Sequence, residues 1–135
     1  MAYPLVKIES IGKRDAASLA AAGIRTTEDL LEVAARPKGR GALAEKTGIG
    51  EEKLLDWANR ADLMRIPGLS AELADLLAAV GVATVPGLKR QQPEQLAAAL
   101  KAANGRRRRV GRVPGEAQCA KLIAAAKALP RMLSY

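Results

Sequence analysis

The residues of this chain best suited to chemistry are arginines that could bind phosphate groups. Arg106, Arg107, Arg108 and Arg109 are consecutive, and Arg112 follows shortly after them. Each guanidinium is charged at neutral pH and presents several N–H donors, which suits it to phosphate oxygens. Consecutive like charges repel one another unless solvent or a partner disperses them. The run therefore predicts contact with a polyanion, and a flexible, solubilising loop is the alternative.

A second pair of cations, Lys13 and Arg14, directly follows Gly12. Both fall where the sequence predicts the N-terminus of a helix, and cations at that end oppose the helix macrodipole. A bound phosphate would reverse this small cost, because backbone N–H groups at a helix N-terminus attract anions. Lys13 and Arg14 are therefore candidate phosphate contacts. The alternative is that both side chains extend into solvent from an exposed turn.

The positive charge of the chain is concentrated in its last third. Residues 88–135 hold 11 Lys and Arg against 2 Asp and Glu, a net charge of +9, and residues 1–87 hold 11 against 12, a net charge of −1. A basic block beside a nearly neutral body is typical of a protein that meets a polyanion on one face. If about five arginines neutralise phosphates, the logarithm of duplex affinity should fall with the logarithm of salt at a slope near −4 to −5.

Residues for catalysis or metal binding are scarce. The chain has no His and one cysteine, Cys119, which is expected to be a small buried thiol. The sequence contains no cluster of residues spaced as metal ligands. It also lacks a Walker-type phosphate loop and a nucleophile elbow. Glu51 and Glu52 could exchange protons, but carboxylates in a first helical turn are typical of interaction with the helix dipole. We therefore expect a protein that is not an enzyme and binds neither metal nor cofactor.

The scarcity of aromatic side chains bears on the kind of nucleic acid. Tyr3, Trp57 and Tyr135 are the only aromatic residues, and Trp57 is expected to be buried. A stacking platform for unpaired bases is therefore not predicted. No helix aligns Asn, Gln and Arg along one face for base readout in the major groove. The sequence favours binding to the backbone of double-stranded DNA with little sequence preference, and it leaves DNA against RNA open.

The sequence contains an internal repeat, which includes the segments that hold the candidate phosphate contacts. Residues 7–31 recur 58 positions later as residues 65–89, and a second segment recurs at a spacing of 65, which places Gly50 on Gly115 and Trp57 on Leu122. Apolar and glycine positions are kept, so a backbone shape is repeated. We expect two tandem repeats, residues 5–62 and residues 63–131, packed as one compact unit. Whether they share one core is left open.

Helix signals predict an all-α fold of about eight short helices. Capping residues, glycines and prolines mark the helix ends. Gly23 and Gly81 are expected to end the first helix of each repeat, Thr26 or Thr27 to cap the second, and Pro37 to separate the second from the third. The expected helices span residues 13–22, 27–35, 39–47, 51–63, 71–80, 85–90, 93–103 and 116–128.

Four turns between those helices share a branched apolar residue between two small residues. They comprise residues 10–12, 48–50, 68–70 and, more loosely, 113–115, and we name them the first to fourth turns. The apolar side chain should fill the groove between two helices, and glycine should supply a positive φ. Gly12, Gly48 and Gly50 are therefore expected to shape turns that present N–H groups to phosphate. Carboxylates follow the second and fourth turns, and Pro114 removes one donor, so a purely structural role is the alternative for the second turn.

These turns resemble the helix-hairpin-helix motif, in which the turn and the next helix N-terminus offer N–H groups to a nucleic-acid phosphate. Across about residues 5–131 the chain also resembles the bacterial family catalogued as domain of unknown function 4332. The segments that carry this resemblance are RPKGRGALAEKTGI, residues 36–49, and WANRADLMRI, residues 57–66. The resemblance implies a tandem helix-hairpin-helix fold, similar to DNA-binding modules of repair proteins and of the RNA polymerase alpha subunit. The family's activity is uncharacterised, so the resemblance implies a fold more than a function.

The remaining expectations concern location and partners. No stretch approaches the roughly 18 apolar residues of a membrane span, and no signal peptide or disulfide framework is indicated. We expect a cytoplasmic bacterial protein that binds duplex DNA. The sequence does not predict its oligomeric state. The rival hypothesis is a protein-interaction or scaffold module, in which Ala-rich helix faces or the basic surface dock a protein. Salt-steep affinity for arbitrary duplexes would favour the first hypothesis, and salt-insensitive binding to one protein the second.

Overall fold

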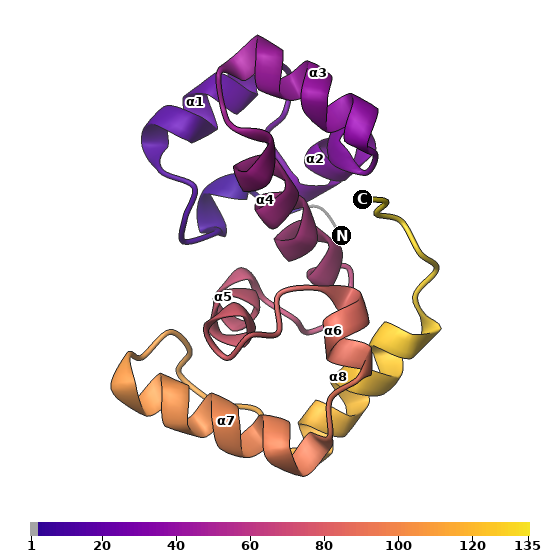
Figure 1. Cartoon of the computed structure of the whole chain (residues 1–135). Coiled ribbons are helices and arrows are strands. Elements are labelled where there is room, and N and C mark those ends of the chain that lie inside the picture. The colour runs from indigo at the N-terminus through magenta and orange to yellow at the C-terminus, as the bar shows by residue number, and fades with distance from the viewer. Residues whose placement is uncertain (1–2) are drawn as a thin grey trace.

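The computed structural model describes residues 3–135, which form an all-α fold without strands, as predicted (Figure 1). A short 3₁₀ helix, η1 (Leu5–Lys7), comes first. The first half then contains α1 (Lys13–Ala21), α2 (Thr27–Ala34), α3 (Pro37–Thr47) and α4 (Glu51–Leu63). The second half contains α5 (Ala71–Ala79), α6 (Val85–Lys89), α7 (Pro93–Arg106) and α8 (Glu116–Ala128).

Two helix ends differ from the prediction by more than one residue. Pro37 is the first residue of α3 and does not lie before it, because a proline at this position gives up an N–H that would have no partner within the helix. Helix α7 continues to Arg106, so Arg106 lies in its last turn and not in the connection where it was expected. A cation in a last helical turn interacts favourably with the macrodipole.

Each half ends its first helix in the same way. Gly23 and Gly81 have φ of 83° and 86°, the left-handed conformation that glycine adopts without a side-chain clash. Both therefore act as the predicted helix stops. In each half the residue after the glycine donates its N–H to the carbonyl five positions back, Ile24 to Leu19 and Val82 to Leu77, both at 2.9 Å.

The second helix of each half begins at a threonine cap. The Thr26 hydroxyl accepts the N–H of Asp29 at 3.2 Å, and the Asp29 carboxylate accepts the N–H of Thr26 at 3.1 Å, which completes a capping box. Thr84 accepts the N–H of Gly87 at 2.9 Å at the start of α6. Of the two threonines that the sequence left open for α2, Thr26 is therefore the cap.

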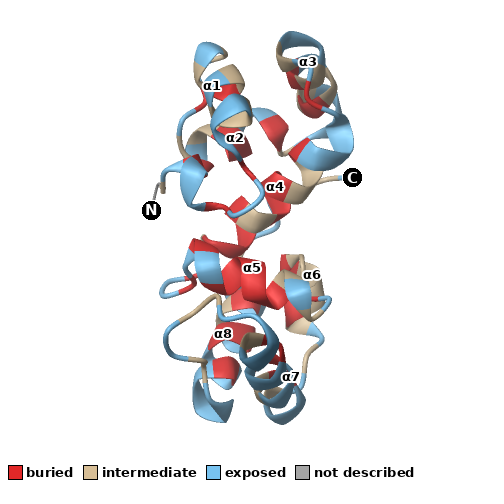
Figure 2. Cartoon of the chain, turned by 90° about the vertical axis from the view of Figure 1, so that its left-hand side faces the viewer, coloured by how far each residue is buried: buried red, intermediate tan, exposed pale blue. Residues whose placement is uncertain are grey.

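One hydrophobic core extends through both halves (Figure 2). Helix α2 packs on α3 and α4, α8 packs on α6 and α7, and α4 joins the halves through α5 and α6. Trp57 is 1% exposed, as predicted, and its indole N–H donates to the Ser10 hydroxyl at 2.9 Å. Cys119 is also buried, and burial raises the pKa of its thiol. This thiol is therefore part of the core.

The segment that follows α8 returns to the first half, a connection that the sequence analysis did not predict. The N–H of Ser134 donates to the carbonyl of Ala35 at 2.8 Å, and the Tyr135 hydroxyl donates to the Asn59 side-chain oxygen at 2.9 Å. Leu133 is 3% exposed within the common core. We name residues 129–135 the tail, and it adds a second tie between the halves.

Candidate nucleic-acid interface

The four turns come together in pairs, one pair in each half. The first and second turns line a hollow of about 1010 Å³, and the third and fourth turns line one of about 520 Å³. We name these the first and second hollows. Gly12 and Gly50 line the first, and Ser70 and Gly115, which align with them in the recurring sequence segments, line the second. Turns that are distant in the sequence thus share one surface in each half.

The apolar residue at the centre of a turn is buried in the first three turns. Ile11, Ile49 and Leu69 are 4%, 6% and 0% exposed. Each side chain therefore fills the space behind its turn, as predicted, and leaves the turn's small residues at the surface.

The glycines of the turns have two different roles. Gly48 has a φ of 74°, as expected, but Gly12 and Gly50 have φ of −80° and −63°. The expectation of a positive φ is therefore wrong for Gly12 and Gly50, because both are N-caps, which need an extended backbone. A Cβ at either would meet no atom within 4 Å. The backbone does not require glycine at these two positions.

Of the four helices that begin at the two hollows, α1, α4, α5 and α8, only α5 has a side-chain cap. Helices α1 and α4 begin at the first hollow, and neither has a hydrogen bond from a cap side chain. At the second hollow, the Ser70 hydroxyl accepts the N–H of Leu73 at 3.1 Å and caps α5. Arg14 lines the first hollow together with Asp15, Glu51 and Glu52, while Lys13 is exposed but does not line it. An anion in this hollow would meet charges of both signs.

The arginine run begins in the last turn of α7 and continues into a connection whose path is set by one side chain. The Asn104 side-chain oxygen accepts the N–H groups of Arg109 at 2.8 Å and Val110 at 3.1 Å, and its amide donates to the carbonyl of Val110 at 3.1 Å. Sequence reasoning missed Asn104, because a lone Asn near a helix end has many possible partners. The exposed arginines of this region are Arg106, Arg107, Arg108 and Arg112.

The candidate residues are divided between several surfaces. Arg112 lines the second hollow, and Arg14 lines the first. Arg109 lines a smaller hollow with Glu9 and Asp75, at the seam between the halves. One arginine thus lies at each pair of turns, Arg14 at the first hollow and Arg112 at the second. Arg109 lies at the seam between the two halves.

Two arginines of the run pair with a carboxylate of the first half. One oxygen of Glu9 forms an ion pair with Arg107, and the other accepts the Nε–H of Arg109 at 3.2 Å. The backbone N–H of Glu9 donates to the Asp75 carboxylate at 3.0 Å, which also accepts from Arg60 at 3.2 Å. Burial raises the pKa of Asp75, although the Glu9 N–H and Arg60 act in the opposite direction. The contacts of Glu9 with Asp75 and Arg109 join residues 66 and 100 positions apart, so no local pattern in the sequence indicates them.

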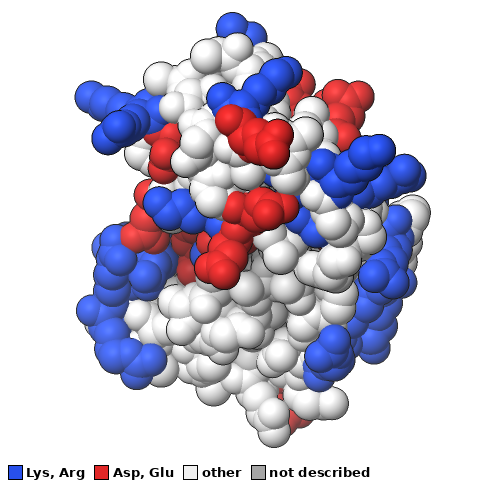
Figure 3. All heavy atoms as spheres, turned by 45° about the horizontal axis from the view of Figure 1, so that its top comes forward, with Lys and Arg blue, Asp and Glu red and all other residues white. Residues whose placement is uncertain are grey.

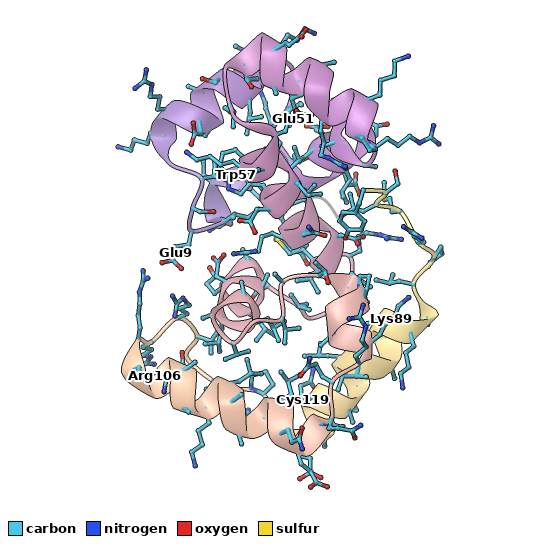
Figure 4. The ribbon with its side chains drawn as sticks, in the orientation of Figure 1. Glu9, Glu51, Trp57, Lys89, Arg106 and Cys119 are labelled. Atoms are coloured by element: carbon cyan, nitrogen blue, oxygen red, sulfur yellow. The ribbon has the colours of Figure 1, made fainter. Side chains whose placement is uncertain are left out.

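The basic residues of the last third do not form a single patch. Arg106 and Lys89 lie on opposite sides of the molecule in Figure 4. Lys89, Arg90 and Arg131 line a hollow beside the tail. Figure 3 shows Lys and Arg on the left and right margins and also at the top of the view, with Asp and Glu mainly between them. We therefore restrict the candidate nucleic-acid interface to the side of the molecule that carries Arg106 to Arg109, and leave out the basic residues around Lys89.

The molecule is thus an all-α protein in which paired turns line one hollow in each half. The chain belongs to the family described as Domain of unknown function (DUF4332), whose model matches residues 9–129. This confirms the family suggested by the segments at residues 36–49 and 57–66. No curated protein and no solved structure matches the chain.

The described residues show neither a group of metal ligands nor a helix that could cross a membrane. Within residues 3–135, no three or more His, Cys, Asp or Glu side chains are grouped so that they could hold a metal ion. In the same part of the chain, every helix is too short or too polar to cross a membrane.

Proposed function

We propose that this is a tandem helix-hairpin-helix protein that binds the backbone of duplex DNA without strong sequence preference and without catalysing a reaction. The observation that carries the proposal is the arginine run, which starts at the end of α7 and continues along a connection with a set path. Arg106, Arg107, Arg108 and Arg112 are exposed there, and Asn104 holds the backbone between them. The planar guanidinium binds phosphate oxygens with two donors and loses little side-chain entropy per hydrogen bond.

The paired turns support the helix-hairpin-helix part of the proposal. Their apolar centres are buried, and helices α1 and α4 start at the first hollow without a side-chain cap. The first N–H groups of these helices suit a phosphate oxygen. Arg14 and Lys53 in the first hollow and Arg112 in the second add cations beside each pair of turns. Two such contacts would follow a continuous phosphate backbone.

The aromatic residues favour a duplex over a single strand as the partner. Trp57 is in the core, and the Tyr135 hydroxyl is bound to Asn59. Neither side chain contributes to a row of rings on which successive unpaired bases could stack. Contact to phosphates alone carries no base information, so we expect similar affinities for duplexes of different sequence.

The test is a salt titration of affinity for an arbitrary duplex. The parent is compared with a variant in which Arg106, Arg107, Arg108 and Arg109 are all replaced by Gln. Each lost phosphate contact should reduce the slope of log affinity against log salt by roughly 0.9. We therefore expect a slope shallower by about 3 to 4 and an affinity weaker by about tenfold or more at low salt.

A matched control removes the same charge elsewhere, by replacing Lys38, Lys89, Arg90 and Lys127 with Gln. A local site requires that this control loses far less affinity than the arginine variant. Unchanged affinity and slope in the arginine variant would remove the proposed site. Exposed alanines such as Ala17 and Ala98 keep the interaction module as the rival, and binding to one protein that ignores salt, with no duplex affinity, would favour it.

A further inference from the structure

We infer that Arg107 and Arg109 form a phosphodiester-binding site that Glu9 occupies in the unbound protein, so that duplex DNA binds there by displacing the Glu9 carboxylate. The inference rests on the proposed function and deepens it. It names the two arginines that change partner, and it names the residue that limits the affinity.

The geometry of the contact is that of an anion held by two arginines. Each oxygen of the Glu9 carboxylate binds a different guanidinium, one from Arg107 and one from Arg109. A phosphodiester also presents two anionic oxygens, and arginine binds carboxylates and phosphates with the same planar set of donors. The pair of arginines is therefore already spaced to receive such a group. The Glu9 carboxylate takes its place in this structure.

The contact of Glu9 with Arg107 and Arg109 is accessible to solvent and weak enough for a phosphate to replace the carboxylate. The side chains of Arg107, Glu9 and Arg109 are 64%, 38% and 19% exposed. Exposed ion pairs contribute little because water and salt screen them, whereas DNA brings a high density of phosphates to the same place. Arg106 and Arg108 flank the site and are exposed, so they can contact neighbouring phosphates.

The backbone of Glu9 is held in place by a contact that does not involve its carboxylate. Its N–H donates to Asp75, which also accepts from Arg60. The carboxylate can therefore rotate away while the first turn keeps its position. Displacement would remove one tie between the halves and leave the α4 packing and the tail in place.

The test compares Glu9→Gln with the parent in the same salt titration. Removing the internal carboxylate frees both arginines, so we expect affinity for an arbitrary duplex to rise by about three- to tenfold at low salt. The salt slope should steepen by about 1. Glu45→Gln is the matched control, because Glu45 is an exposed carboxylate of α3 that forms no ion pair within residues 3–135. It should raise affinity by less than twofold.

A double-mutant cycle separates the site from a general effect of charge. In a variant that carries Arg107→Gln and Arg109→Gln, the gain from Glu9→Gln should disappear. A gain that persists there, or that Glu45→Gln reproduces, would overturn the inference. An unchanged or weaker affinity of the Glu9→Gln variant beside a parent that binds would overturn it and leave the proposed function standing. If neither the parent nor Glu9→Gln binds any duplex, both proposals fail. Circular dichroism should show the same helical content in each variant.

Discussion

Gly12 and Ser70 occupy the same position of the two halves, yet only the serine caps its helix. Ser70 satisfies an N–H of α5 with its own hydroxyl, while α1 has no such bond. The space at Gly12 would accept a side chain, so packing does not explain the glycine. A glycine that leaves helix N–H groups accessible is consistent with an external acceptor, such as the phosphate proposed for the first turn.

Gly12→Ser should therefore change stability and binding in opposite directions. The new hydroxyl can accept the N–H of Asp15, as Ser70 does for Leu73, and raise the free energy of unfolding by a few tenths of a kcal/mol. By occupying that donor it should weaken duplex binding by about twofold to fivefold. Urea unfolding and a duplex titration measure the two effects. A more stable variant with unchanged affinity would exclude the first turn from the interface. Gly23→Ala is the comparison variant. Because Gly23 has a φ of 83°, this change should lower the free energy of unfolding by about 1 kcal/mol.

At the scale of the element, the capping box of α2 predicts a dependence of stability on pH. The backbone N–H groups of Arg25 and Thr26 lower the pKa of the Asp29 carboxyl below its ordinary value of 3.8. An acid whose pKa is lower in the folded state contributes stability above its unfolded pKa and loses it as the pH falls through the folded value. Asp29→Asn should thus be less stable than the parent at pH 7.

The difference between Asp29→Asn and the parent should shrink as the pH falls from the ordinary value of 3.8 through the lower pKa of the folded state. Over this range Asp29 becomes protonated in the folded as well as in the unfolded state, so its charge no longer stabilises the fold. Unfolding in urea at several pH values gives this difference directly. Glu32→Gln, a change at an exposed carboxylate of the same helix, is the control and should show little pH-dependent difference. A difference for Asp29→Asn that is constant from pH 7 to acid would contradict the role of the carboxylate charge.

The elements were also the features that the sequence predicted best, for a physical reason. Helix ends depend on residues within a turn of one another, as Thr26 and Gly23 illustrate, so a local pattern contains the necessary information. The family segments and the buried centres of the turns were likewise predictable. Gly12 was misinterpreted because small residues serve both as extended N-caps and as left-handed turns. Glu9 was missed because its partners lie 66 and 100 residues away, where the chain returns on itself. Asn104 was missed although its partners are near in sequence, because a lone Asn near a helix end has many possible partners.

At the scale of the whole molecule, the continuous core predicts that the halves unfold together. Leu133 is 3% exposed and belongs to the tail, whereas Trp57, the single tryptophan, lies in the first half. Leu133→Ala should cost about 2 to 5 kcal/mol. In a single cooperative unit, this loss shifts the transition seen by Trp57 fluorescence as much as the transition seen by circular dichroism.

The control for this prediction is Met132→Ala, since Met132 is 38% exposed and its removal should change stability little. Two separate transitions in the Leu133→Ala variant, with the fluorescence transition left at the parent's midpoint, would show that the halves unfold independently. The tail would then be a surface attachment and not a tie between them.

The distance along the chain between the residues at the seam has a kinetic consequence. Glu9 meets Arg109 across 100 residues, and Ser134 meets Ala35 across 99, whereas the helices and their caps form from near neighbours. Local contacts form early, and contacts that close long loops form late because the entropy of closure must be lost first. Interactions made after the transition state slow unfolding and leave the folding rate almost unchanged. The contacts of Glu9 and of the tail would accordingly act together to slow the loss of the folded state, with little effect on how quickly it forms.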